Sequence, residues 1–176
     1  MDITEKELVT PIISSMDVVK IGEISCGYPI YCDRNAMEAD GIVVCGRIKP
    51  HTSIKGTVES GLCKMMVVGL GKHLGATCFH RQGYAKLAEL LPKGAEVFLK
   101  KANILFGLGI IEDAFGSTLK VEAIIPEEII EREAELLKEA KENMPQILLD
   151  EIDVLIIRRI GKDISGAGMD PNITGR

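Results

Sequence analysis

The stretch Asp40-Gly41-Ile42-Val43-Val44-Cys45-Gly46 decides the fold class of this 176-residue chain. Its apolar residues run without interruption between two glycines, a pattern typical of a buried strand in a parallel sheet. The polar stretch 47–60 that follows predicts a long loop at the carboxyl end of that strand. Because α/β folds place ligand-binding residues on such loops, this segment is the first candidate for a functional site.

Strands and helices are predicted to alternate on both sides of this stretch. The pattern predicts further strands at 17–24, 28–32, 103–112, 117–125 and 153–160. It predicts helices at 33–39 (capped by Asp33), 60–70 (capped by Ser60), 83–101 (interrupted at Pro92) and from Pro126 to about Asn143. This alternation predicts an α/β fold with a mostly parallel sheet flanked by helices.

The carboxyl-terminal part of the chain differs from the rest. We expect residues 1–145 to form the α/β domain and residues 146–176 to begin a second domain or an interdomain segment. The final residues are rich in glycine and polar side chains, as ligand-contacting loops are, and Gly166, Gly168, Asp170 and Asn172 resemble a ligand-adjacent turn. The expectation is a fold truncated at both ends.

Composition excludes several classes of protein. The net charge is −5, and nothing resembles the basic stripe that a nucleic-acid-binding protein needs. No apolar run approaches the roughly 20 residues that cross a bilayer, and the acidic start is unlike a signal peptide. We therefore expect a cytoplasmic protein that binds neither membrane nor nucleic acid. Its five cysteines are irregularly spaced, which favours mostly buried thiols over a zinc site or disulfides.

Three histidines and several lysines gather within one short region. His51, His73 and His80 are the only histidines of the chain, and Lys64 lies among them within an apolar run. A lysine held in a core has a lowered pKa and becomes a nucleophile or covalent anchor. A lysine that extends along its helix to solvent keeps an ordinary pKa and takes neither role.

The glycines at 69, 71 and 75 predict either a phosphate-binding loop or a tight bend. A straight helix would separate Lys64 from His80 by about 24 Å, so a bend is needed to bring them together.

Lys49-Pro50-His51, then Gly61-Leu62-Cys63-Lys64, then His80 sixteen residues after that lysine resemble the nickel-dependent lactate racemase family. The resemblance implies that His51 is a catalytic acid/base, that Lys64 is the covalent anchor of the cofactor and that His80 is a nickel ligand. The implied cofactor is a nickel-pincer nucleotide, a pyridinium-3,5-bisthiocarboxylic-type mononucleotide that holds Ni. Lys49 and Lys72 are further candidate cofactor-binding residues.

The resemblance also implies an activity and partners. The activity is that of a racemase or epimerase of a 2-hydroxy acid, which works by hydride transfer. The implied partners are that small-molecule substrate and the cofactor-biosynthesis proteins, and a homo-oligomer is compatible with the sequence. The family's other catalytic histidine and its substrate-binding arginine would lie upstream of Met1, so we expect the isolated chain to be incomplete as an enzyme.

The loop from His51 to Lys64 is longer than in lactate racemase, and Leu62-Cys63 replaces a glycine pair. Two alternatives stay open: a non-catalytic nucleotide- or phosphate-binding domain, and a packing module without a ligand.

Overall fold

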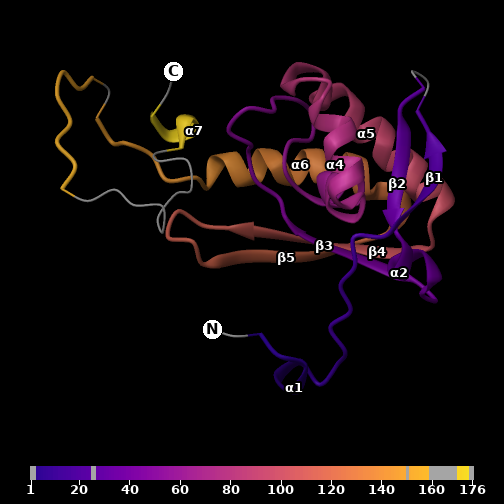
Figure 1. Ribbon diagram of the computed structural model, residues 1–176. Coiled ribbons are helices and arrows are strands. Elements are labelled where there is room, and N and C mark those ends of the chain that lie inside the picture. Colours follow the sequence, from indigo (N-terminus) through magenta and orange to yellow (C-terminus); the bar gives the residue numbers. More distant parts are fainter. Residues whose placement is uncertain (1–2, 25–26, 150, 159–169, 175–176) are drawn as a thin grey trace.

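The computed structural model describes residues 3–24, 27–149, 151–158 and 170–174. Its main sheet has the order β3-β4-β5 (Figure 1). Strand β3 (Ile42–Arg47) pairs in parallel with β4 (Ile104–Glu112), and β4 pairs antiparallel with β5 (Thr118–Ile124). A second sheet is the antiparallel hairpin of β1 (Val18–Glu23) and β2 (Pro29–Asp33). These five strands lie where the sequence predicted them.

The prediction of a mostly parallel sheet is wrong for the described part of the chain, although the α/β class is confirmed in its mixed form. Among the strands of the described residues, only β3 and β4 pair in parallel. The helices between residues 62 and 101 provide the crossover that a parallel pair needs. Only residues 113–117 separate β4 from β5, and so short a connection can join antiparallel strands only.

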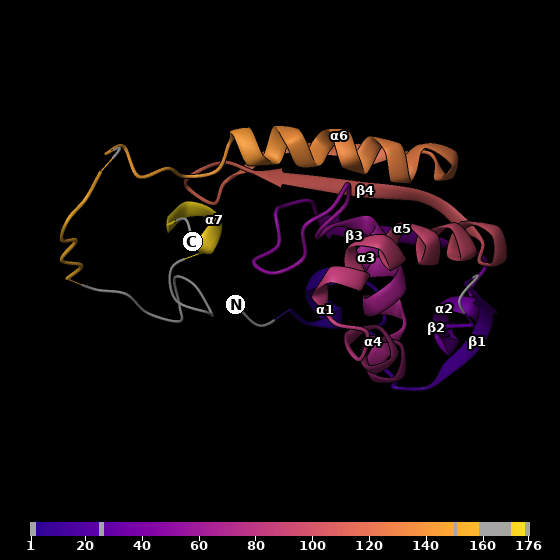
Figure 2. The ribbon, with the colours of Figure 1, turned by 90° about the horizontal axis from the view of Figure 1, so that it is seen from above.

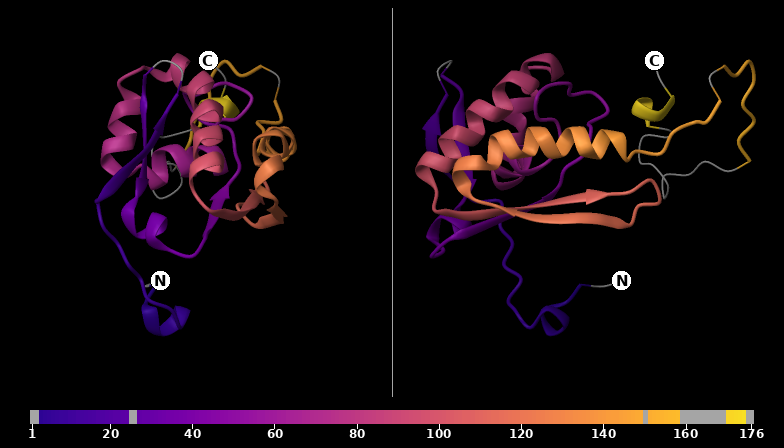
Figure 3. Two further views of the ribbon diagram at one scale, coloured as in Figure 1. Left: turned by 90° about the vertical axis from the view of Figure 1, so that its right-hand side faces the viewer. Right: turned by 180° about the vertical axis from the view of Figure 1, so that it is seen from behind.

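Helices cover one face of the main sheet and leave the other face open (Figures 1 and 3). Ile42 and Val44 of β3 are buried, whereas Val43 on the opposite face is 45% exposed. Phe106 of β4 and Val121 of β5 lie on the same open face and are 37% and 54% exposed. Strand β3 is therefore buried on one face, not on both as its continuous apolar run predicted.

Helix α6 (Ile129–Glu142) lies along the covered face of the sheet and follows the short 3-10 helix η2 (Pro126–Glu128), so the predicted start at Pro126 is confirmed. Ile129, Leu136 and Leu137 are buried against the sheet. Ion pairs fix the helix to β5, where Lys120 Nζ lies 2.6 Å from a Glu139 carboxylate oxygen and Arg132 pairs with Glu122.

Helix α5 (Tyr84–Lys101) is continuous, so the interruption predicted at Pro92 is wrong. An interior proline costs a helix roughly 3 kcal/mol. Buried residues on both sides of it, among them Leu87, Leu91, Ala95 and Phe98, hold the two halves in one line. The hairpin β1–β2 packs against this helix and against α4 (Lys72–His80), as the view from above shows (Figure 2).

Further short helices are α1 (Glu5–Leu8), α2 (Arg34–Glu38, capped by Asp33 as predicted), α3 (Leu62–Lys64), the π-helix η1 (Met65–Leu70) and α7 (Pro171–Thr174). The strand predicted at 153–160 is absent from its described residues, 153–158, where Val154 and Ile156 are 77% and 89% exposed and pair with no strand; residues 159–160 lie outside the described part. The domain boundary near 145 stays a prediction. Within the described residues, no helix is long and apolar enough to cross a membrane.

Candidate functional site

The loop after β3 is anchored at both ends and packed in the middle. The Lys49 backbone N–H donates to the Ser60 carbonyl at 2.9 Å, which closes the loop at its base. Ile54 and Val58, at its centre, are 1% and 0% exposed. Burial of these two side chains fixes a loop that has no regular secondary structure, so the side chains it carries have defined positions.

Glu59 holds His51 within this loop. The carboxylate of Glu59 is 2% exposed and accepts the His51 backbone N–H at 2.8 Å. Lys141 Nζ of α6 lies 2.8 Å from the other Glu59 oxygen, and Lys55 Nζ lies 3.7 Å from the oxygen that accepts the His51 N–H. A buried carboxylate needs such partners, and this one connects the His51 backbone to α6.

Lys64 lies at the junction of two kinds of helix. It ends α3 (Leu62–Lys64), and the π-helix η1 (Met65–Leu70) follows directly. The predicted cap, Ser60, makes no capping hydrogen bond, because the residue before the helix is Gly61. Instead the buried Glu133 of α6 accepts the Cys63 backbone N–H at 2.7 Å. A Cβ at Gly61 would lie 2.5 Å from Glu133 Oε1, so glycine is needed for this approach.

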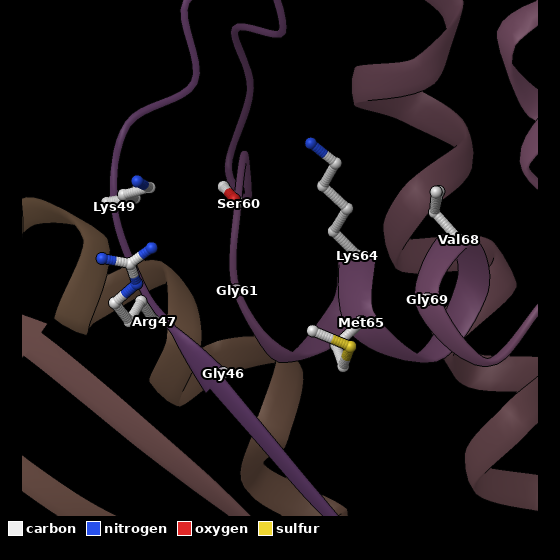
Figure 4. Close-up of a pocket in the computed structure, with 9 residues that line it drawn as sticks. All are labelled: Gly46, Arg47, Lys49, Ser60, Gly61, Lys64, Met65, Val68 and Gly69. Carbon is white, nitrogen blue, oxygen red and sulfur yellow. The ribbon is translucent and has the colours of Figure 1, made fainter. Parts of the chain in front are cut away.

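A cavity of about 310 Å³ opens between the end of β3 and this helix junction (Figure 4). Arg47, Lys49 and Lys64 contribute its cationic groups, and Ser60, Met65 and Val68 complete its polar and apolar walls. Arg47 already binds Glu112, with its Nη1 2.9 and 3.1 Å from the two carboxylate oxygens. Within the described residues, Lys49 and Lys64 make no ion pair, so their ammonium groups are available to an anion.

Lys64 is half-buried, and its pKa lies below the ordinary 10.5 because burial disfavours the ammonium ion and Lys49 repels it. Lys64 is therefore neither a fully buried amine in the core nor a side chain that extends freely into solvent. Lys64 lines the cavity, and its side chain extends away from the helix junction (Figure 4). An amine of lowered pKa is neutral more often and is the better nucleophile.

His51 and His80 both lie near Tyr84. The Tyr84 ring centroid is 6.4 Å from that of His51 and 6.2 Å from that of His80, the latter in an edge-to-face arrangement. Gly83, with φ of 78°, turns the chain from α4 into α5 and so sets Tyr84 beside His80. The charges of Lys64 and His80 both lower the pKa of His51, after the larger effect of burial.

Of the predicted residues, Lys49 and Lys64 line the cavity. His51 and His80 do not line it, but His51 lies close enough to Lys64 and His80 for their charges to lower its pKa. Lys72 lies on the far side of the bend and pairs with the Asp33 carboxylate at 2.7 Å. The bend was one of the two interpretations of the glycine run, and it separates η1 from α4 at Gly71. Asn172, from the predicted ligand-adjacent turn, donates to the His51 carbonyl at 3.3 Å. Gly166 and Gly168 lie outside the described residues.

Sequence reasoning gave no role to Glu59, Glu133 or Tyr84. Glu133 has a recognisable signal, since it interrupts the apolar stripe of Ile129, Leu136 and Ala140 with a charge that α6 then buries. Tyr84 has none, because an aromatic residue at the start of a helix is ordinary. Only the tertiary structure shows that its ring lies near two histidines.

The residues present fit a cofactor that carries an anionic group and a metal. The free lysines suit a phosphate, the Lys64 amine suits a covalent link, and the His80 imidazole suits a borderline metal such as nickel. Among the described residues, no three His, Cys, Asp or Glu side chains gather as a metal site. A metal held here would take most of its ligands from the bound cofactor.

The sequence matches no protein-family model, and it matches no curated protein sequence. The structure is similar to the lactate racemase apoprotein from Thermoanaerobacterium thermosaccharolyticum, with a TM-score of 0.52 and 21% sequence identity. The similarity covers 68% of this chain and 30% of that one, so the chain spans less than a third of the lactate racemase. The chain therefore has part of a lactate racemase-like fold.

Proposed function

We propose that this chain forms the cofactor-anchoring part of a lactate racemase-like enzyme that racemises or epimerises a 2-hydroxy acid. The observation that carries the proposal is the convergence of His51, Lys64 and His80 at the carboxyl end of β3, on a fold that resembles lactate racemase. These three side chains come from the loop after β3, from α3 and from the end of α4, and α/β folds place their ligands at such strand ends.

Each residue has a role that its environment supports. Lys64 would hold the nickel-pincer nucleotide through its amine, Lys49 would face its anionic group, and His80 would ligate the metal. When bound, the cofactor would supply the hydride-transfer chemistry that the protein side chains lack. His51 would bind the substrate hydroxyl oxygen, and the rings of both histidines lie near that of Tyr84.

The test is mass spectrometry of the chain after coexpression with the cofactor-biosynthesis proteins and nickel. We expect a mass increment on the peptide that contains Lys64, and we expect Lys64→Ala to lose it. Lys86→Ala is the matched control, because it removes an exposed lysine of α5 outside the cavity and leaves the anchor in place. Coexpressed T. thermosaccharolyticum lactate racemase serves as the positive control. If the control enzyme carries the cofactor while Lys64 of this chain stays unmodified, the proposal is refuted.

A second function has support from the cavity alone. Lys49 and Lys64, which make no ion pair with any residue that the structure describes, would also suit a non-catalytic domain that binds a nucleotide or phosphate. This alternative predicts reversible binding of a mononucleotide with Lys64 unmodified. Calorimetry with nicotinic acid mononucleotide, on the chain as purified and on Lys64→Ala, distinguishes reversible charge recognition from covalent anchoring.

A further inference from the structure

The loop segment 51–54 folds around the imidazole of His51. The backbone N–H groups of Ser53 and Ile54 both donate to His51 Nδ1, each at 3.0 Å. A ring nitrogen that accepts hydrogen bonds has its lone pair free and carries no proton. In the neutral ring, the single proton is then on Nε2.

The surroundings prevent the ring from leaving this arrangement easily. The backbone N–H of His51 donates to Glu59 at 2.8 Å, and the backbone carbonyl of His51 accepts from Lys55 Nζ at 2.7 Å. Ile54, whose N–H is one of the two donors, is fixed by burial at 1% exposure. Turning the ring over would place a C–H where Nδ1 now lies, and both backbone donors would lose their partner.

The charged form of the ring is also disfavoured. An imidazolium carries a proton on Nδ1, which would then point at two backbone N–H groups. Burial, Lys64, Lys55 and His80 lower the pKa of His51, and only Glu59 raises it. Geometry and charge therefore both favour the neutral ring.

We infer that residues 51–54 hold His51 as the neutral Nε2–H tautomer, so that it presents a hydrogen-bond donor to its ligand. The matching ligand atom is an oxygen that accepts, such as a carboxylate, carbonyl or hydroxyl oxygen of a 2-hydroxy acid. In this respect the inference rests on the proposed function. It assigns His51 to binding and polarising that oxygen, and it leaves removal of the hydroxyl proton to a group outside residues 51–54.

The test is nitrogen NMR on the unsubstituted chain, with ¹⁵N-labelled histidine and backbone. We expect the His51 ring to show a protonated Nε2 and an unprotonated Nδ1 at neutral pH. We also expect the Ser53 and Ile54 amides to exchange slowly with solvent. Because the free imidazole already favours this tautomer, the deciding observation is scalar coupling between Nδ1 and at least one of these amide nitrogens. A protonated Nδ1, or no coupling, would overturn the inference.

Two substitutions separate the acceptor from the donor. His51→Asn retains an acceptor near the position of Nδ1, so the Ser53 and Ile54 amides should stay protected from exchange. His51→Ala removes the acceptor, and the exchange of both amides should accelerate at least tenfold. Equal protection in the parent chain and in His51→Ala would contradict the inference. Neither measurement depends on the cofactor, so a bare Lys64 would refute the proposed function and leave this result unaffected.

Discussion

Glu133 offers the sharpest test of how this fold supports its site. Its carboxylate is 1% exposed, accepts the Cys63 N–H at 2.7 Å and leaves Oε1 without a hydrogen-bond partner among the described residues. Burial raises the pKa of Glu133 above the ordinary 4.5, and the bonds to Cys63 and Leu62 oppose that rise only in part. The folded state therefore holds the Glu133 proton to a higher pH than the unfolded state does.

The sign of the pH effect follows from this difference. Between pH 4.5 and the higher pKa of the folded state, the native protein binds more protons than the unfolded protein. The free energy of unfolding therefore falls as pH rises through that interval. Glu133→Gln keeps the shape of the side chain and removes the titration. The stability of this variant relative to the parent should increase from pH 5 to pH 8, by about 1.4 kcal/mol for each pKa unit of the shift.

Urea denaturation followed by far-ultraviolet circular dichroism measures these free energies, since the chain has no tryptophan to report by fluorescence. Glu131→Gln, at an exposed position of the same helix, controls for loss of one charge. Glu133→Ala should cost about 2–4 kcal/mol at pH 5, because the Cys63 N–H loses its acceptor and a small cavity remains. The reasoning would be refuted if the difference in the free energy of unfolding between Glu133→Gln and the parent chain were the same at pH 5 and pH 8.

Three further predictions concern other parts of the molecule. Half-maximal acylation of Lys64, followed by peptide mass spectrometry, should occur below pH 10.5, and Lys49→Met should move it upward because it removes a repelling charge. His51 should titrate below pH 6.5 in a proton NMR titration. Its contribution to the free energy of unfolding should be fully present above pH 6.5 and should be lost as pH falls from 6.5 through the lower pKa of the folded state. Its midpoint should rise in Lys64→Met, and an unchanged midpoint would count against their proximity. Phe98→Ala, at a fully buried position of α5, should lower the free energy of unfolding by about 3–5 kcal/mol in urea, and a loss under 1 kcal/mol would contradict the described packing.

Much of the fold was predictable because it depends on short-range patterns. The strands at β1 to β5 follow from runs of apolar residues, and Pro126 followed by two glutamates predicted the start of the α6 segment. Strand direction was not predictable in the same way. It depends on which connection is long enough to cross over the sheet. The short link at 113–117 is not, so β5 runs antiparallel to β4 and not parallel to it as the predicted sheet implied. Likewise, whether a face of β3 is covered depends on where the helices pack, and a local pattern does not contain that information.

The site divides in a similar manner. The sequence by itself determined which residues have the chemistry: His51, Lys64 and His80 stand out as a histidine in a polar loop, a lysine in an apolar run and a histidine beyond a cluster of glycines. Only the tertiary structure decided their environment. Glu59 and Glu133 hold this region through contacts between residues 8 and 70 positions apart in the chain. The reason is physical: a side chain's type sets the reactions open to it, whereas burial and neighbouring charges, which set its pKa and tautomer, exist only once the chain has folded.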